Sequence, residues 1–158
     1  MHSGLEFDVI FGPAYKGIPL ASATAIALAR NHQIDKPYSF NRKEKKAHGE
    51  GGNLVGADLK GKALIIDDVI TAGTAIREAA KIIKDNGAIL GGMLFAMDRQ
   101  EKSPSGISTI QEIKKDFNVP VLSIITLEEI IKFLVVAKDP NLQKHLKNIE
   151  AYQEQYGV

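Results

Sequence analysis

The chain has 158 residues, a length that corresponds to one domain, residues 1–158, and leaves no room for a second full one. Its 20 basic and 19 acidic residues give a formal net charge of +1, which excludes a general polyanion binder, so any basic site must be local. The absence of cysteine excludes a disulfide framework and a thiol nucleophile, and it suits a reducing compartment. With no targeting segment and no run of about 18 apolar residues, we expect a soluble, cytoplasmic protein.

Apolar runs and helical patterns alternate along the chain. In chain order, the pattern predicts a strand at 7–11, a helix at 17–31, a strand at 63–67, a helix at 74–86, a strand at 92–97, a helix at 108–117, a strand at 121–125, a helix at 127–135 and a polar amphipathic helix at about 141–155. The runs show no polar alternation, as expected for strands that are covered on both faces. Together they predict an α/β fold with a Rossmann-like parallel sheet flanked by helices.

The stretch from Asn41 to Gly56 does not fit this core. It reads NRKEKKAHGEGGNLVG and holds four glycines. From Arg42 to His48 it carries four positive side chains and one negative, a local charge of +3 before His48 is counted. A solvated surface loop is one interpretation, but loops of this length are usually either disordered or functional. Since the glycines allow hinge motion and the cations suit an anion, we predict a mobile, anion-binding loop at about 42–53.

The segment from Leu64 to Ala75 carries the strongest chemical signal. It reads LIIDDVITAGTA, so a buried strand delivers Asp67 and Asp68 to a turn of small residues that opens a helix. Ligands bind outside the carboxyl ends of strands in open α/β sheets, and backbone amides at such a helix start bind phosphate. The carboxylates suit sugar hydroxyls or a Mg²⁺ that is held through water. Carboxylates for the sugar and amides for the phosphate together indicate a ribose 5-phosphate site. The alternative, two helix-capping residues, would leave buried carboxylates without partners.

A second loop, from Phe11 to Gly17, also follows a strand directly. It reads FGPAYKG, and Gly12 and Gly17 are expected to permit sharp backbone turns. Tyr15 and Lys16 then lie at the loop tip, where an anion can reach them. An ordinary strand-to-helix turn is the alternative, but beside the acid pair the loop predicts a second anion pocket on the same sheet edge.

Other nucleotide-site patterns are missing from the sequence. It contains neither G-x-x-x-x-G-K-[ST] nor G-x-G-x-x-G, so a Walker site and the dinucleotide fingerprint are excluded. It has no H-E-x-x-H zinc motif and no nucleophile elbow. Its four histidines are scattered and indicate no metal site.

These segments resemble the type I phosphoribosyltransferases. The stretch from Leu64 to Ala75 is similar to that superfamily's diphosphoribose signature. The stretches Phe11–Gly17 and Asn41–Gly56, with the sequence DRQE at 98–101, narrow the resemblance to the orotate phosphoribosyltransferases. The similarity covers essentially the whole chain and implies the type I phosphoribosyltransferase fold.

The resemblance also implies roles for individual residues. The implied catalytic residues are Lys43, Lys46, His48, Asp67 and Asp68. The implied contacts to 5-phosphoribosyl 1-diphosphate are Tyr15, Lys16, Arg42, Lys43, Lys46, His48, Asp67, Asp68, Val69, Ile70, Thr71, Ala72, Gly73, Thr74 and Ala75. The implied orotate contacts are Thr71 and Arg99, whose planar guanidinium suits the orotate carboxylate.

The implied reaction is Mg²⁺-dependent transfer of phosphoribosyl to orotate, which gives orotidine 5′-monophosphate and diphosphate in de novo UMP biosynthesis. The Mg²⁺ would be held by substrate and water, with no direct protein ligand. The family resemblance implies a homodimer whose mobile loops reach the neighbouring subunit's site. Neither nucleic acid nor a membrane is an expected partner.

Two other functions remain open at this stage. Members of the resembled family normally have several dozen further residues before the first strand, and these residues form a hood over the base. This sequence resembles the family without that hood, so we expect it to bind orotate less well. The protein could then be a non-catalytic binding or regulatory protein, with RNA at the Arg42–Lys46 cluster as one ligand. The net charge of +1 and an aromatic content of 6% weigh against RNA. Transfer to another base is the second alternative.

Overall fold

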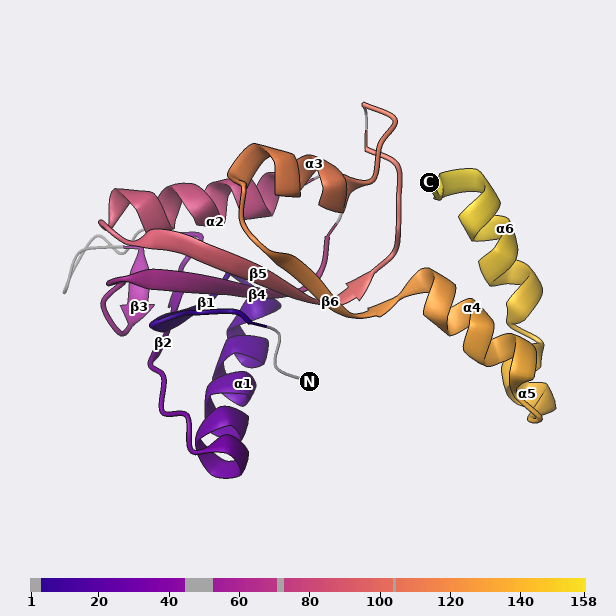
Figure 1. Ribbon diagram of the computed structural model, residues 1–158, viewed down its shortest axis with the longest axis horizontal. Helices are drawn as coiled ribbons and strands as arrows, with labels where there is room; N and C mark the ends of the chain where they lie inside the picture. Colours follow the sequence, from indigo (N-terminus) through magenta and orange to yellow (C-terminus); the bar gives the residue numbers. More distant parts are fainter. Residues whose placement is uncertain (1–3, 45–52, 71–72, 104) are drawn as a thin grey trace.

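A computed structural model of the protein describes residues 4–44, 53–70, 73–103 and 105–158. Its strands are β1 (Val9–Gly12), β2 (Tyr38–Asn41), β3 (Leu54–Gly56), β4 (Lys62–Val69), β5 (Ile89–Asp98) and β6 (Val121–Thr126). Its helices are α1 (Gly17–His32), α2 (Thr74–Asp85), α3 (Thr109–Phe117), α4 (Leu127–Val136), α5 (Pro140–Gln143) and α6 (Leu146–Tyr156). Figure 1 shows one twisted sheet with helices on both of its faces.

The six strands form one sheet in the order β3-β2-β1-β4-β5-β6. All neighbouring pairs are parallel except β2 with β3, which is antiparallel. The predicted α/β class and the parallel arrangement of the four predicted strands are therefore confirmed. The strands β2 and β3 were not predicted, and the antiparallel pairing of β3 with β2 makes the sheet mixed. They contain only four and three residues, too few to display a hydrophobic period.

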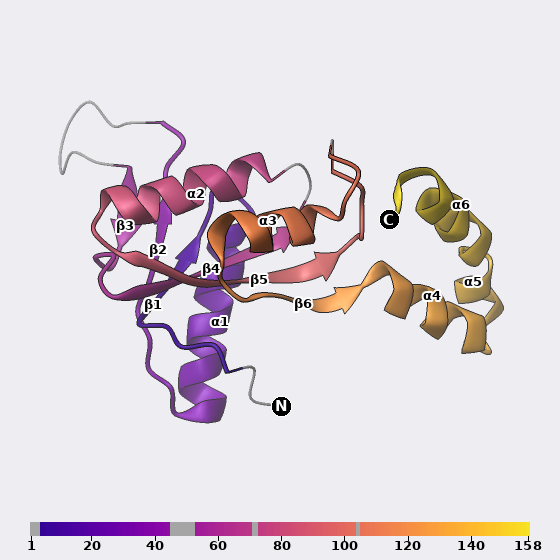
Figure 2. The same cartoon turned by 45° about the horizontal axis from the view of Figure 1, so that its top comes forward.

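Helices α2 and α3 cover one face of the sheet (Figures 1 and 2). The core on this face joins Ile65 of β4 and Phe95 of β5 to Ile83 of α2 and Ile113 of α3, and the side chains of all four are fully buried. Burying a side chain of this size stabilises the fold by about 1.5–3 kcal/mol. This packing fixes the carboxyl ends of β4 and β5 relative to each other.

Helix α1 covers the opposite face, beside β1 and β4 (Figures 1 and 2). Its buried residues Ala21 and Ala25 pack against Ile10, Leu64 and Ile66 of the sheet. Alanine has almost no side chain, so the helix lies close to the strands. The first turn of α1 is thereby held next to the carboxyl ends of β1 and β4.

The prediction of one continuous helix at about 141–155 is wrong, because the segment forms two helices, α5 and α6. Asp139 caps α5 by accepting a hydrogen bond from the Asn141 amide at 2.8 Å, and Pro140 occupies the first helical position. The His145 amide then donates to the carbonyl of Leu142, which makes a tight turn that ends this short helix before α6 begins.

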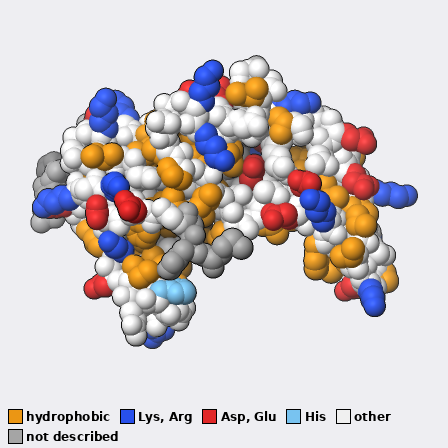
Figure 3. All heavy atoms as spheres, viewed as in Figure 1, with side chains coloured by type: hydrophobic (Ala, Val, Ile, Leu, Met, Phe, Trp, Pro, Cys, Tyr) orange, Lys and Arg blue, Asp and Glu red, His pale blue; other side chains and the backbone are white. Residues whose placement is uncertain are grey.

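Helices α4 to α6 extend beyond the edge strand β6 as an arm (Figures 1 and 2). Three large apolar side chains of α4, Phe133, Val135 and Val136, are mostly exposed on this arm. Figure 3 shows hydrophobic side chains gathered there. Across the described ranges, the structure contains no helix with the length and apolar character that a membrane crossing requires.

Candidate functional site

The predicted acid pair lies near the carboxyl end of β4. Neighbouring residues of a strand point to opposite faces. Asp68 therefore shares the α1 side with Ile66, and its Oδ2 lies 2.7 Å from Nζ of Lys16 at the start of α1. The amide of Asp68 donates a hydrogen bond of 2.9 Å to Oδ1 of Asp67. The structure thus joins two predicted segments, although 52 residues separate Lys16 from Asp68.

The two carboxyl groups differ in acidity. Burial raises the pKa of Asp67, the charge of Asp68 adds to this effect, and the Asp68 amide opposes it only in part. Burial also acts to raise the pKa of Asp68, but the hydrogen bonds from Lys16 and from the Val69 amide outweigh it, so the pKa of Asp68 is lowered. The hydrogen bond to Asp68 in turn raises the pKa of Lys16. Asp68 is therefore the fixed negative charge of the pair, and Asp67 is the carboxyl that protonates more readily.

The half-buried carboxyl of Asp67 predicts a pH dependence of stability. Its pKa is higher in the folded than in the unfolded protein, so its stabilising contribution is complete below the unfolded pKa and is lost as the pH rises through the folded pKa. We expect the free energy of unfolding of the wild type, relative to Asp67→Asn, to fall as the pH is raised from about 4 to about 7. Urea unfolding of both proteins across this pH range measures the difference in their free energies of unfolding. A difference that grows in favour of the wild type as the pH rises would contradict the raised pKa of Asp67.

The loop between β1 and α1 presents Tyr15 and Lys16. The chain does turn at residues 14–16, but neither Gly12 nor Gly17 has a positive φ, so the turn requires no left-handed backbone at either glycine. They are needed for close approach instead: a Cβ on Gly12 would lie 2.3 Å from the Gly17 carbonyl oxygen, and a Cβ on Gly17 would lie 2.8 Å from the Ile66 carbonyl oxygen. The loop therefore packs directly on the backbone beside the acid pair.

Asn41 is a site residue that the sequence analysis missed. It lies at the end of β2, is buried, and its Oδ1 accepts a hydrogen bond of 2.9 Å from the Ala14 amide. This bond fixes the Tyr15 loop from the β2 side. The only sequence signal is a polar residue at the start of a charged stretch, which resembles many surface positions.

The described start of the charged stretch reaches the same loop. Lys43 Nζ lies 5.1 Å from the centroid of the Tyr15 ring, within the range of a cation–π contact. A cavity of about 450 Å³ is lined by Tyr15, Ile18, Phe40, Asn41, Arg42, Lys43 and Glu44. The predicted residues Tyr15, Arg42 and Lys43 are therefore brought together, whereas Lys46 and His48 lie outside the described residues.

The predicted phosphate turn leads into α2. Thr71 and Ala72 lie outside the described residues, whereas Val69, Ile70, Gly73, Thr74 and Ala75 are described. Gly73 is the N-cap residue, with φ of 76°, and it offers no side chain to its helix amides. The first turn of α2 also contains no acidic side chain. The amides and the positive end of the helix dipole therefore suit an external anion.

The predicted orotate contact Arg99 follows β5, the strand next to β4. Its Nε lies 3.1 Å from Oε1 of Glu101, and its Nη2 donates to Oε2 of Glu101 at 3.4 Å. Strands β4 and β5 are parallel and paired through Val69 and Met97, so their carboxyl ends lie together. The positive charge of Arg99 also opposes the rise in the pKa of Lys16. Arg99, Lys16 and the acid pair therefore share one edge of the sheet.

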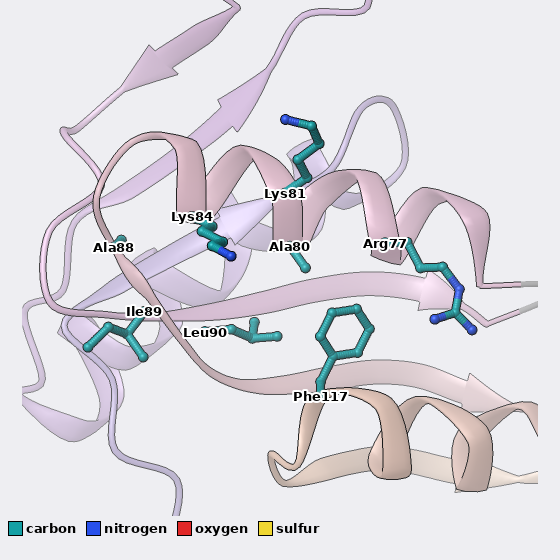
Figure 4. Close-up of a pocket in the computed structure, with 8 residues that line it drawn as sticks. All are labelled: Arg77, Ala80, Lys81, Lys84, Ala88, Ile89, Leu90 and Phe117. Atoms are coloured by element: carbon teal, nitrogen blue, oxygen red, sulfur yellow. The ribbon is translucent and has the colours of Figure 1, made fainter.

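A separate groove lies between α2, the start of β5 and α3. It has a volume of about 630 Å³ and is lined by Arg77, Ala80, Lys81, Lys84, Ala88, Ile89, Leu90 and Phe117. Figure 4 shows the Phe117 ring pointing into it. Because Ile89 begins β5, part of this groove lies at the amino end of the sheet, away from the acids at the carboxyl end.

Comparison with known proteins places this chain in a family. The family described as "Phosphoribosyl transferase domain" matches residues 2–122. Curated orotate phosphoribosyltransferases are similar: that of Pseudomonas savastanoi pv. phaseolicola is 60% identical over 158 residues, covering 100% of this chain and 73% of the relative. That of Escherichia coli O139:H28 is 58% identical over 156 residues, covering 99% and 72%.

Solved structures agree with these sequence matches. The crystal structure of orotate phosphoribosyltransferase from Francisella tularensis has a TM-score of 0.80 and 40% identity, covering 99% of this chain and 73% of that one. The Mycobacterium tuberculosis enzyme, in complex with 5-phospho-α-D-ribosyl 1-diphosphate, has a TM-score of 0.63 at 17% identity, covering 80% and 66%, and supports the fold alone. The chain belongs to the phosphoribosyltransferase family and, within it, to the orotate phosphoribosyltransferases.

Proposed function

We propose that this protein transfers the phosphoribosyl group of 5-phosphoribosyl 1-diphosphate to orotate, giving orotidine 5′-monophosphate and diphosphate. One observation carries the proposal: the acid pair of β4, Lys16 before α1 and Arg99 after β5 share one edge of the sheet with the start of α2. The acid pair suits a ribose and Lys16 suits a diphosphate. Arg99 suits a carboxylate, and the start of α2 suits a 5′-phosphate. The product belongs to pyrimidine nucleotide biosynthesis.

The ribose 5-phosphate would occupy the end of β4 and the start of α2. The amides around Gly73 and Thr74 would bind the 5′-phosphate, aided by the Thr74 hydroxyl. Asp67 and Asp68 would accept hydrogen bonds from the ribose hydroxyls. Their negative charge would also stabilise the cationic ribosyl centre that develops as the diphosphate leaves.

The diphosphate would bind between the Tyr15 loop and the charged stretch. Lys16 is mostly exposed and is held by a single carboxylate, so it can turn from Asp68 to a diphosphate at little cost. That exchange would free Asp68 for the ribose. Lys43 already lies beside Tyr15. We propose that Lys46 and His48 join them on the leaving group and that the loop at about 42–53 closes over the donor to exclude water.

Mg²⁺ fits this site as an ion that is bound mainly by substrate. Hard carboxylate oxygens suit Mg²⁺, but Asp68 is paired with Lys16, and no cluster of three or more His, Cys, Asp or Glu side chains occurs among the described residues. Asp67 and Asp68 would therefore hold it through water and the ribose. When bound, the ion would neutralise charge on the diphosphate, while the described residues bind and orient the donor.

Arg99 is proposed to bind the orotate carboxylate. We expect Arg99→Ala to raise the KM for orotate by roughly 100-fold, the loss of a charge-assisted, bidentate contact, with the KM for the donor nearly unchanged. Steady-state kinetics with each substrate varied in turn measure the change. Arg77→Ala is the matched control, because Arg77 is also ion-paired but lies at the separate groove. An equal rise in both KM values would argue against base recognition by Arg99.

We also propose a homodimer in the cytoplasm, in which the loop at about 42–53 reaches the neighbouring subunit's site. The family resemblance supports this assembly. Sedimentation analysis tests the oligomeric state, and cell fractionation tests the compartment. Mixing the double variant Asp67→Asn/Asp68→Asn with Lys46→Ala, each expected to lack turnover alone, tests the shared site, since restored turnover requires loops that cross between subunits.

The proposed reaction is tested by the loss of orotate absorbance. The protein, orotate and 5-phosphoribosyl 1-diphosphate are mixed with and without Mg²⁺, and turnover is expected only in its presence. Parallel assays with adenine, hypoxanthine and uracil test the other bases. Donor binding by calorimetry without turnover of any base would instead support a non-catalytic binding protein.

A further inference from the structure

A cluster formed by Arg99, Glu101 and Tyr152 joins the proposed base contact to the last helix. The hydroxyl of Tyr152, on α6, donates a hydrogen bond to Oε1 of Glu101. The same carboxylate faces both Nε and Nη2 of Arg99. Glu101 therefore bridges a guanidinium at the sheet edge and a phenol 51 residues later in the chain.

Glu101 determines which edge of the Arg99 guanidinium is available. Nε of Arg99 is buried and, although only 3.1 Å from Glu101, it is not aligned for a hydrogen bond. Within the described part of the chain, all hydrogen bonds and ion pairs of Arg99 go to Glu101. They occupy the Nε–Nη2 edge, which leaves Nη1 and the second Nη2 proton for another acceptor. A guanidinium held in this way presents its end to an incoming carboxylate.

The C-terminal segment in turn holds Glu101. The Lys102 amide donates to the Tyr156 carbonyl at 2.9 Å, and the Val158 amide donates to the Gln100 carbonyl at 3.0 Å. Figures 1 and 2 both show the C-terminus beside the loop that follows β5. The hydrogen bond to Glu101, together with burial, raises the pKa of Tyr152, so its hydroxyl keeps the proton that it donates. Backbone and side-chain contacts from the C-terminal segment thus hold the loop that follows β5 in place.

We propose that Glu101 and Tyr152 are positioning residues for orotate, which hold Arg99 with its free edge toward the base. This inference rests on the proposed function. It gives α6 a role in substrate recognition, because among the residues that the structure describes α6 reaches the site through this cluster and the adjoining backbone contacts. The proposed donor contacts in the loop after β1, on β4 and at the start of α2 do not include these residues, so the effect is confined to the base.

The test is a comparison of Tyr152→Phe with Tyr156→Phe. The control is closely matched: the two rings lie 4.9 Å apart on α6, and the backbone contact of Tyr156 survives the change. We expect Tyr152→Phe to raise the KM for orotate about fivefold, with kcat and the KM for the donor changed less than about twofold, whereas Tyr156→Phe has no effect. Glu101→Gln, which weakens the ion pair with Arg99, should raise the KM for orotate about tenfold.

A double-mutant cycle separates positioning from general stability. If Tyr152 acts through Arg99, adding Tyr152→Phe to Arg99→Ala should leave the KM for orotate unchanged, because nothing remains to be positioned. Independent effects that multiply, or equal changes in both KM values together with a lower melting temperature, would overturn the inference. Wild-type protein that consumes no orotate would overturn the proposed function itself, whereas wild-type turnover with an unchanged KM in Tyr152→Phe would overturn only this inference.

Discussion

Replacing Asp67 and Asp68 together by Asn is expected to lower turnover by roughly 1000-fold or more, a loss typical of removing preorganised charge from a reacting centre. Asparagine keeps the size and the oxygen acceptor of each side chain but removes the negative charge. The ribose hydroxyls would still find acceptors, whereas the cationic ribosyl centre would lose its stabilisation. The loss should therefore appear mainly in kcat, with a smaller effect on the KM for the donor.

The same double substitution should leave the fold intact. Asn at position 67 can still accept the hydrogen bond from the residue 68 amide, and it removes a carboxylate whose ionisation burial disfavours. Asp67→Asn alone should therefore have a free energy of unfolding at neutral pH equal to or above that of the wild type. Asp68→Asn loses only the contact to Lys16, which is mostly exposed and contributes little to stability.

Urea unfolding and steady-state kinetics on the two single variants and the double variant measure both effects. Asp85→Asn provides the control, since Asp85 also pairs with a lysine, Lys81, but lies at the end of α2. It should retain full turnover. Persistent activity in the double variant would show that the acids have no catalytic role, and a double variant that fails to fold would show that their role is structural.

Much of this site could be predicted because its chemistry is local in the sequence. Asp67, Asp68 and the turn after them follow a buried strand directly, and the carboxyl ends of parallel strands meet at one edge. The predicted strand at 63–67 and helix at 74–86 are confirmed as β4 and α2 with shifts of one or two residues. Lys16 could be placed by the same rule, because it follows the neighbouring strand β1, whereas Arg99 was expected from the family resemblance.

The parts that could not be predicted depend on contacts between distant segments. Asn41 matters because β2 carries it to the Ala14 amide, and β2 is too short to leave a pattern in the sequence. The link from Tyr152 to Glu101 depends on the turn between α5 and α6, where a single helix was expected. Neither residue type is unusual at its position. A polar residue acquires such a role only when the tertiary fold brings its partner to it.

Gly12→Ala is expected to be the most destabilising single change at this site, with a loss of about 3 kcal/mol or more in the free energy of unfolding. The new Cβ would lie 2.3 Å from the carbonyl oxygen and 2.7 Å from the carbonyl carbon of Gly17, and 2.8 Å from the Cβ of Ala21. Two of these atoms belong to the backbone at the start of α1, so no side-chain rotation can relieve the clash. Helix α1 must move away from β1.

The movement would also separate Lys16 from Asp68, because Lys16 immediately precedes α1. Any folded fraction of the variant should therefore bind the donor more weakly, which calorimetry under stabilising conditions can measure alongside urea unfolding. Gly87→Ala is the control: a Cβ there meets no atom within 4 Å, and its φ of +81° alone should cost about 1 kcal/mol. Donor affinity should be unchanged in this control. If Gly12→Ala were as stable as Gly87→Ala, the backbones of β1 and α1 could not lie as close together as the loop's packing requires.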